Sequence, residues 1–276
     1  MRLVDAASYF DRTPVYEADG STPLFKGQLD DYDDSKRDSG AAYRRILSVR
    51  PGTAMPATRA VRMFDLTWLV GAKETDGLDQ AHRDKYVLQR AGVKLTVNRL
   101  PDFVSGAVGQ TKWADPEWLK DSHELATSSK VPQIFSVFLP LGTDVRVYDV
   151  LWYAGAAFLT MAVRDLPSGF RAAECLELDQ TVPAIASITR RTYDPVAGSF
   201  TSAASVDTPC LRVRWQSLYL YSSQSDTKYQ EGDTSLVVGP SVPVSTADNV
   251  LFDGVTWQVL DVDSLGGANV IHARLL

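Results

Sequence analysis

The chain has 276 residues, 45% of them hydrophobic and 22% charged, which is typical of a folded soluble protein and excludes a disordered one. Its formal net charge of −6 argues against a protein that grips nucleic acid through its phosphates, because such binding needs clustered lysine and arginine. No apolar run approaches the ~20 residues that span a bilayer, and the N-terminus lacks the pattern of a secretory signal. We therefore expect no membrane association, and we expect the protein to be synthesised in a cytoplasm.

Two polar segments are predicted to be exposed loops. The first, 29–40, is rich in aspartate, and the second, 222–235, has almost no apolar residue. A calcium site is the alternative for the first loop, but it lacks the glycine and the distal glutamate of an EF-hand. A solvated acidic loop or an interface loop fits better, and in an assembly the candidate contact residues of the two loops are Asp30, Asp31, Asp33, Asp34, Tyr229 and Glu231.

A short phrase recurs along the chain. Residues 61–71 and 145–155 share Val, Arg, Asp, Trp and Gly at the same spacing, and 252–257 repeat the aromatic, the aspartate and the tryptophan. An aspartate suits the backbone of a tight turn, and aromatic side chains on either side can pair across a hairpin. The phrase therefore predicts repeated β-hairpins, although chance similarity between β-rich segments is the alternative. The hairpin residues are Phe64, Asp65, Trp68, Tyr148, Asp149, Trp152, Phe252, Asp253 and Trp257. We expect the three tryptophans to lie in the core and not at a contact surface.

Two segments favour helix. In 115–125, Asp115 can cap the free amides and Pro116 suits the first helical position. A second helix is expected over about residues 79–91, although β-branched and aromatic residues leave helix and strand both open for its later half. Most other segments alternate or are β-branched, with turns at short intervals, so the predicted fold class is mainly β. We expect two or three small β-barrel or sandwich modules related by an internal repeat, with one or two short helices.

Residues that carry chemistry are sparse. His82, His123 and His272 lie far apart in no metal-binding spacing, and the chain has no nucleophile elbow, P-loop or dinucleotide-binding glycine pattern. Cys175 and Cys210 fit no zinc or redox spacing and are expected to be buried free thiols. We predict a protein without catalytic residues, metal or cofactor.

The C-terminal stretch resembles a known family. Gly232-Asp233 precedes the strand 235–238, and Asp248 is followed by the run 250–259, which contains Gly254 and Trp257. This order resembles the small β-barrel head-closure, or stopper, proteins of tailed bacteriophages, which carry a "G-D, strand, D-x-V, G-x-x-aromatic-x-V" pattern. Residues 44–90 are similar in style.

The resemblance implies a structural virion protein that is assembled in the host bacterial cytoplasm. Its expected role is a six- or twelvefold ring of itself in the neck, which joins the portal or adaptor protein to a tail protein and helps to retain packaged DNA. DNA would pass nearby without specific binding, as the acidic charge allows. The alternatives are a tail terminator, a tail-tube or minor tail protein, or a carbohydrate-binding β-module. The predicted modules are an N-terminal β module with a short helical appendage (1–128), a central β-hairpin module (129–182) and a C-terminal stopper-like barrel (183–276).

Overall fold

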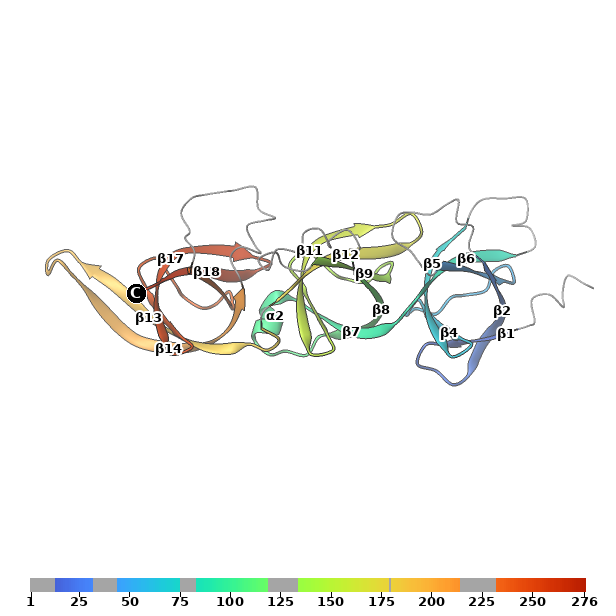
Figure 1. Ribbon diagram of the computed structural model, residues 1–276, viewed down its shortest axis with the longest axis horizontal. Coiled ribbons are helices and arrows are strands. Elements are labelled where there is room, and N and C mark those ends of the chain that lie inside the picture. Colours follow the sequence, from blue (N-terminus) through green and yellow to red (C-terminus); the bar gives the residue numbers. More distant parts are fainter. Residues whose placement is uncertain (1–12, 32–43, 75–82, 119–133, 179, 214–231) are drawn as a thin grey trace, which may run out of the picture.

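The computed structural model describes residues 13–31, 44–74, 83–118, 134–178, 180–213 and 232–276. Three closed antiparallel β-barrels of six strands follow one another along the chain, which confirms the mainly β prediction (Figure 1). Barrel 1 consists of β1 (Thr13–Glu17), β2 (Pro23–Asp31), β3 (Arg44–Val49), β4 (Ala60–Met63), β5 (Leu66–Lys73) and β6 (Asp84–Arg90). Barrel 2 consists of β7 (Val93–Asn98), β8 (Gln110–Trp118), β9 (Ile134–Pro140), β10 (Val150–Tyr153), β11 (Ala156–Asp165) and β12 (Phe170–Glu177). Barrel 3 consists of β13 (Ala184–Asp194), β14 (Ser199–Val213), β15 (Thr234–Val238), β16 (Asn249–Phe252), β17 (Val255–Leu265) and β18 (Ala268–Leu275).

All three barrels have one topology. The neighbour order in barrel 1 is β1-β2-β3-β6-β5-β4, and the corresponding strands of barrels 2 and 3 follow the same order. The predicted module boundary at 128 is wrong, because β7 and β8 close barrel 2 and not barrel 1. A hairpin alone leaves backbone groups unpaired, so the central module needs these two strands to complete its sheet. The third barrel begins at Ala184, next to the predicted boundary at 183.

The predicted helix over 115–125 is wrong for the residues that the structure describes. Asp115 and Pro116 belong to β8, where Pro116 pairs with Val137 of β9. The register of β8 with β7 ends at Ala114, so this end of β8 is paired on one side only and tolerates a proline. Barrel closure outweighs the local capping signal.

The predicted helix over 79–91 is also wrong where the structure describes it. Residues 84–90 form β6, which lies between β3 and β5. Tyr86 and Leu88 point into barrel 1, whereas Val87 joins a cluster shared with barrel 2. A strand buried on both faces lacks polar alternation, which is why its sequence does not distinguish strand from buried helix. The described helix is α2 (Leu100–Val104), a single turn after β7.

Successive side chains of β5 pack into two different hydrophobic clusters. In β5, Trp68 and Val70 fill barrel 1, while Leu69 between them points outward into the joint with barrel 2. Successive strand residues face opposite sides of a sheet, so one strand contributes to both clusters. The barrels are therefore joined by hydrophobic packing and not only by the connecting chain.

The first joint unites two cross-strand pairs. Barrel 1 contributes the pair Ala60–Leu69, and barrel 2 contributes the pair Phe138–Ala172. None of the four side chains is more than 6% exposed.

The second joint repeats this arrangement with equivalent residues. Barrel 2 contributes Val150–Leu159, which corresponds in register to Ala60–Leu69, and barrel 3 contributes Val237–Val270, which corresponds to Phe138–Ala172. The side-chain sizes differ between the joints. Val150 is larger than its equivalent Ala60, and Val237 is smaller than its equivalent Phe138. Phe103 of α2 completes this cluster. The two joints thus share one geometry and achieve close packing with different side chains.

The first joint also contains a close backbone contact. The Ala72 N–H of β5 donates a hydrogen bond of 2.9 Å to the Ser168 carbonyl in the turn between β11 and β12. Gly169 of this turn has φ +81°, and a Cβ there would lie 2.0 Å from the Ala72 nitrogen. A Cβ on Gly71 would lie 2.3 Å from the Ser168 oxygen. Both glycines are required for the approach of the two barrels.

Asp84 fixes a turn at one end of barrel 1. Its carboxylate accepts hydrogen bonds from Gly52 N–H at 2.9 Å and from Lys73 Nζ at 2.6 Å. The Lys73 hydrogen bond lowers the pKa of Asp84, and the Gly52 hydrogen bond adds to this effect although burial opposes it.

Replacing Asp84 by asparagine is expected to lower the melting temperature at pH 7 by about 2–4 °C, since a charge-assisted contact is lost. A group whose pKa is lowered by folding stabilises the folded state at pH values above its unfolded pKa. This contribution is lost as the pH falls through the folded-state pKa. The difference in melting temperature between Asp84→Asn and the parent should therefore shrink toward pH 3, as calorimetry can measure. A constant difference would contradict this electrostatic role.

Candidate functional site

Two of the three predicted hairpins have the expected turns, but the predicted aromatic pairs across them are wrong, because Trp68 pairs with Val61 and Trp257 with Val250. In barrel 1, Phe64 and Asp65 form the turn between β4 and β5 with φ +49° and +58°. In barrel 3, Asp253 and Gly254 form the turn between β16 and β17 with φ +51° and +74°. Positive φ at both central residues is typical of a two-residue hairpin turn.

The second hairpin turns six residues later than the phrase predicts. The β10–β11 hairpin turns at Ala154-Gly155, with φ +51° and +83°, whereas Tyr148 and Asp149 precede β10. The repeated backbone hydrogen bonds fix this alignment: Val70 N–H to Arg59 O, Thr160 N–H to Asp149 O, and Val259 N–H to Asp248 O. The shared phrase is Gly155-x-x-Phe158 and Gly254-x-x-Trp257, which the accidental identities at 145–155 obscured.

The predicted core position of the tryptophans holds for two of them. Trp68 is 5% exposed inside barrel 1, and Trp257 packs against the core of barrel 3. Trp152 lies on β10 with 42% of its surface exposed, so its predicted core position is wrong. Phe158 occupies the equivalent core position in barrel 2.

Replacing Trp68 or Phe158 by alanine is expected to cost about 3–5 kcal/mol of unfolding free energy, because each fills a barrel. Trp152→Ala should change the free energy of unfolding by less than about 0.5 kcal/mol. Guanidinium unfolding of the three variants measures the differences. A large loss for Trp152→Ala would contradict the corrected repeat.

The predicted acidic loop begins inside a strand. Asp30 and Asp31 belong to β2, and the Asp30 carboxylate accepts hydrogen bonds from Gln28 Nε2 at 2.6 Å and Ser48 Oγ at 2.9 Å. Their assignment to an exposed loop is therefore wrong, because the strand continues to complete barrel 1. The end of the second predicted loop is also wrong, because Thr234 and Ser235 begin β15 and are buried. The remaining candidate loop residues, Asp33, Asp34, Tyr229 and Glu231, lie outside the described residues. Among the described residues, no group of three or more His, Cys, Asp or Glu is arranged to hold a metal ion.

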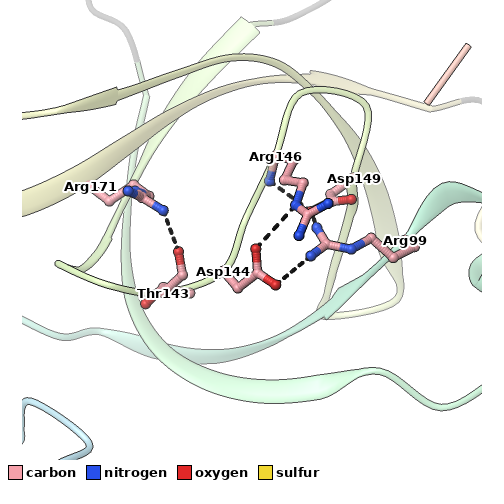
Figure 2. A network of polar contacts seen from close by, with 6 residues as sticks. All are labelled: Arg99, Thr143, Asp144, Arg146, Asp149 and Arg171. Carbon is pink, nitrogen blue, oxygen red and sulfur yellow. Dashed lines mark hydrogen bonds and ion pairs between the residues drawn. The ribbon is translucent and has the colours of Figure 1, made fainter. Parts of the chain in front are cut away.

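A charged network holds the loop before β10 in barrel 2 (Figure 2). The Arg99 guanidinium contacts Asp144 at 2.6 Å and also Asp149. Asp149, which is 3% exposed, accepts a further hydrogen bond of 2.7 Å from the Arg146 backbone N–H. On the other side of the loop, Arg171 donates a hydrogen bond of 2.7 Å to the Thr143 carbonyl.

The two carboxyl groups of this network respond differently to their surroundings. Burial raises the pKa of Asp149, against the hydrogen bond from Arg146 and the charge of Arg99. The Arg99 hydrogen bond lowers the pKa of the exposed Asp144, and Arg146 adds to this effect. Both carboxylates are bound by arginine, so neither is placed as a general base. A pocket of about 180 Å³ lies beside Arg99 and Asp144.

The network has a structural counterpart in barrel 3. Asp248, at the position equivalent to Asp149, is fully buried and accepts hydrogen bonds from the backbone N–H groups of Ser245 and Arg191, each at 2.8 Å. In both barrels a buried aspartate therefore anchors the loop that leads into the hairpin. This repetition indicates a scaffolding role for Asp149, the buried carboxylate of the network in Figure 2.

Ser235, His272 and Asp263 form a chain of hydrogen bonds on barrel 3. The Ser235 Oγ lies 2.9 Å from His272 Nδ1, and His272 Nε2 lies 3.1 Å from Asp263 Oδ2. These are the residue types of a hydrolase triad, but Ser235 is 0% exposed, and a nucleophile must reach its substrate. These three hydrogen-bonded side chains therefore link β15, β18 and β17, from the buried Ser235 to the exposed Asp263.

The two cysteines are both free and buried, as predicted. Burial raises the pKa of each thiol to about 12, so little reactive thiolate exists at neutral pH.

The most prominent surface feature is a hairpin arm, defined as residues 190–206 of β13 and β14. The register of β13 with β16 ends at Thr189, and that of β14 with β15 ends at Cys210. Within the described part of the chain, the arm strands therefore pair only with each other. Figure 1 shows the arm extending past barrel 3, away from the other two barrels.

The arm is ordered by its own contacts. The Tyr193 and Phe200 rings meet edge to face at 5.3 Å, and the Arg191 guanidinium lies 4.5 Å from the Phe200 ring centre. At the tip, the Asp194 carboxylate accepts hydrogen bonds from Val196 N–H at 2.8 Å and Ala197 N–H at 3.2 Å. A two-stranded ribbon is only marginally stable in water, so these contacts compensate for the missing sheet.

The two faces of the arm differ. The cross-strand pairs Arg191–Ser202 and Tyr193–Phe200 share one face, and Thr192–Thr201 lies on the other. Tyr193, Phe200 and the tip residue Val196 are 54%, 44% and 95% exposed. One face is thus aromatic and the other is hydroxylated, which favours contact of the aromatic face with another surface. The arm was not predicted from the sequence, although Asp194-Pro195 marks its turn.

Both ends of the row of barrels lack the apolar pair that forms the joints. On barrel 3 the pair equivalent to Ala60–Leu69 is Asn249–Gln258. On barrel 1 the pair equivalent to Phe138–Ala172 is Ser48–Lys85. Polar outer faces are typical of the terminal units of a repeat array. The two terminal barrels therefore cannot form a further joint of this kind, and end-to-end stacking of molecules is not favoured.

The chain matches no protein-family model, no curated protein and no solved structure at a significant level. Among the described residues, no helix has the length and apolar character to cross a membrane.

Proposed function

We propose that the protein is a structural subunit of the neck of a tailed bacteriophage, where a ring of copies joins the portal vertex to the tail and helps to retain packaged DNA. The observation that carries the assembly role is the hairpin arm, whose aromatic side chains Tyr193 and Phe200 are about half exposed. Hydrophobic joints support a rigid subunit that can transmit load between its ends.

The phage neck is favoured by the motif resemblance. The Asp-x-apolar and Gly-x-x-aromatic elements of the head-closure pattern occur in barrel 3 at Asp248 and Gly254–Trp257, and again in barrel 2 at Asp149 and Gly155–Phe158. In both barrels the aspartate anchors a loop and the glycine forms the hairpin turn. A net charge of −6 suits a channel wall that DNA passes without binding.

Electron microscopy of the purified full chain, alone and mixed with candidate portal and tail proteins, tests this proposal. We expect closed rings of the chain, either free or assembled on a portal. Pull-down against portal and tail-tube proteins separates the neck from a tail terminator or tail-tube role. Monomers that bind neither partner would contradict the proposal.

A carbohydrate-binding module is the second candidate, because Trp152 is exposed on barrel 2. Quenching of tryptophan fluorescence by an oligosaccharide, lost in Trp152→Ala, would support it. Unchanged fluorescence across an oligosaccharide panel would remove its support.

A further inference from the structure

We propose that the arm of one molecule packs its aromatic face on the outer surface of barrel 3 in a second copy of this chain. This inference rests on the proposed assembly role and names the partner of the arm. The arm extends away from its own barrels, so its aromatic face meets a surface of another molecule (Figure 1).

The receiving surface lies where β13, β14 and β16 run side by side. Its centre is apolar, with Ile185 61% and Leu251 47% exposed. Ser187 pairs with Leu251 on one side and with Asp207 on the other, so these side chains share one face of the sheet. We call Ile185, Asp207, Pro209 and Leu251 the barrel 3 patch.

Charge complementarity favours this occupant. The arm carries Arg190, Arg191 and a single acid, Asp194, whose carboxylate is engaged by the tip. The barrel 3 patch carries the acid Asp207 and no basic residue. Aromatic side chains flanked by arginine therefore meet aliphatic side chains flanked by aspartate, an arrangement that fixes orientation as well as affinity.

The ends of the molecule support the same conclusion. Asn249–Gln258 and Ser48–Lys85 leave no apolar pair for another joint of the inter-barrel type. Two molecules that exchange arms form a closed dimer. When each arm instead engages the next molecule along, the contact is heterologous and closes into a ring when the rotation permits.

Sedimentation of the full chain across a concentration series tests the proposal. We expect self-association that weakens at least roughly tenfold in Val196→Ser/Phe200→Ser. Val108→Ser is the matched control, because Val108 is 97% exposed on barrel 2 and remote from the arm. Arg191→Glu should weaken association similarly, and Asp207→Arg in the same chain should restore part of it.

Crosslinking gives an independent readout. A Val196→Cys preparation mixed with an Ile185→Cys preparation should form a mixed dimer with a flexible bis-maleimide, whereas Val108→Cys mixed with Ile185→Cys should not. Cys175 and Cys210 are fully buried and give little background. Circular dichroism confirms that each variant is folded.

The outcomes separate the two proposals. Rings that form unchanged in the arm variants would overturn the arm contact and leave the neck role intact. A chain that stays monomeric alone but binds a portal or tail protein would also overturn it. Absence of both self-association and partner binding would overturn the neck role as well.

Discussion

Replacing Phe138 by alanine is expected to lower the free energy of unfolding by about 3–5 kcal/mol. Phe138 is the largest side chain of the four that form the cross-strand pairs of the first joint, and it is 6% exposed. Its loss opens a cavity against Ala60 and Leu69, which are too small to fill it. Denaturant unfolding followed by fluorescence measures the loss.

The second joint supplies the compensating change. There, Val150 stands at the position of Ala60 and Val237 at the position of Phe138. Ala60→Val alone should cost about 1–3 kcal/mol by overpacking. Combined with Phe138→Ala, it should recover part of the loss, so the double variant costs less than the sum of the two single changes. Strict additivity would show that the two side chains do not share one cluster.

Gly169→Ala is expected to cost about 2–5 kcal/mol, the second large effect. A left-handed backbone costs about 1–2 kcal/mol for a residue with a Cβ. The Cβ would also lie 2.0 Å from the Ala72 nitrogen, which adds an overpacking cost of about 1–3 kcal/mol and breaks the Ala72–Ser168 hydrogen bond. Backbone amides at the first joint should exchange their hydrogens faster in Gly169→Ala than in the parent protein.

Gly142→Ala is the matched control for this experiment. Gly142 has φ +87°, close to that of Gly169, but a Cβ there has no atom within 4 Å. It should cost only the backbone strain of about 1–2 kcal/mol. Equal losses in the two variants would show that the close approach of the barrels contributes nothing.

The mainly β fold and the repeat were predictable because both are local in origin. Asp253-Gly254 predicts its turn from two residues, and Trp257 follows it at the spacing that places the side chain inside barrel 3. The true second copy was also visible in Gly155-x-x-Phe158. It was overlooked because Trp152 and Asp149 gave more identities at a different register.

Helix and strand were confused where local signals conflict with barrel closure. Asp115 and Pro116 carry a helix-start signal, yet β8 is needed between β7 and β9. Residues 84–90 face a core on each side and so lose the alternation that identifies a strand. The strands that pair with β6 and β8 lie outside a window of a few residues, so no short segment contains the contacts that decide between helix and strand.

The amino-acid sequence alone determined that this chain forms small β modules with hairpin turns, because turn residues and alternation act within a few positions. Only the tertiary structure decided that Leu69 and Leu159 seal joints between barrels, that the ends carry Ser48–Lys85 and Asn249–Gln258, and that the arm stands free. These properties depend on which face of a strand meets which neighbour. That choice follows from closing each barrel and stacking it on the next, since burial of apolar area depends on contacts between residues far apart in the chain.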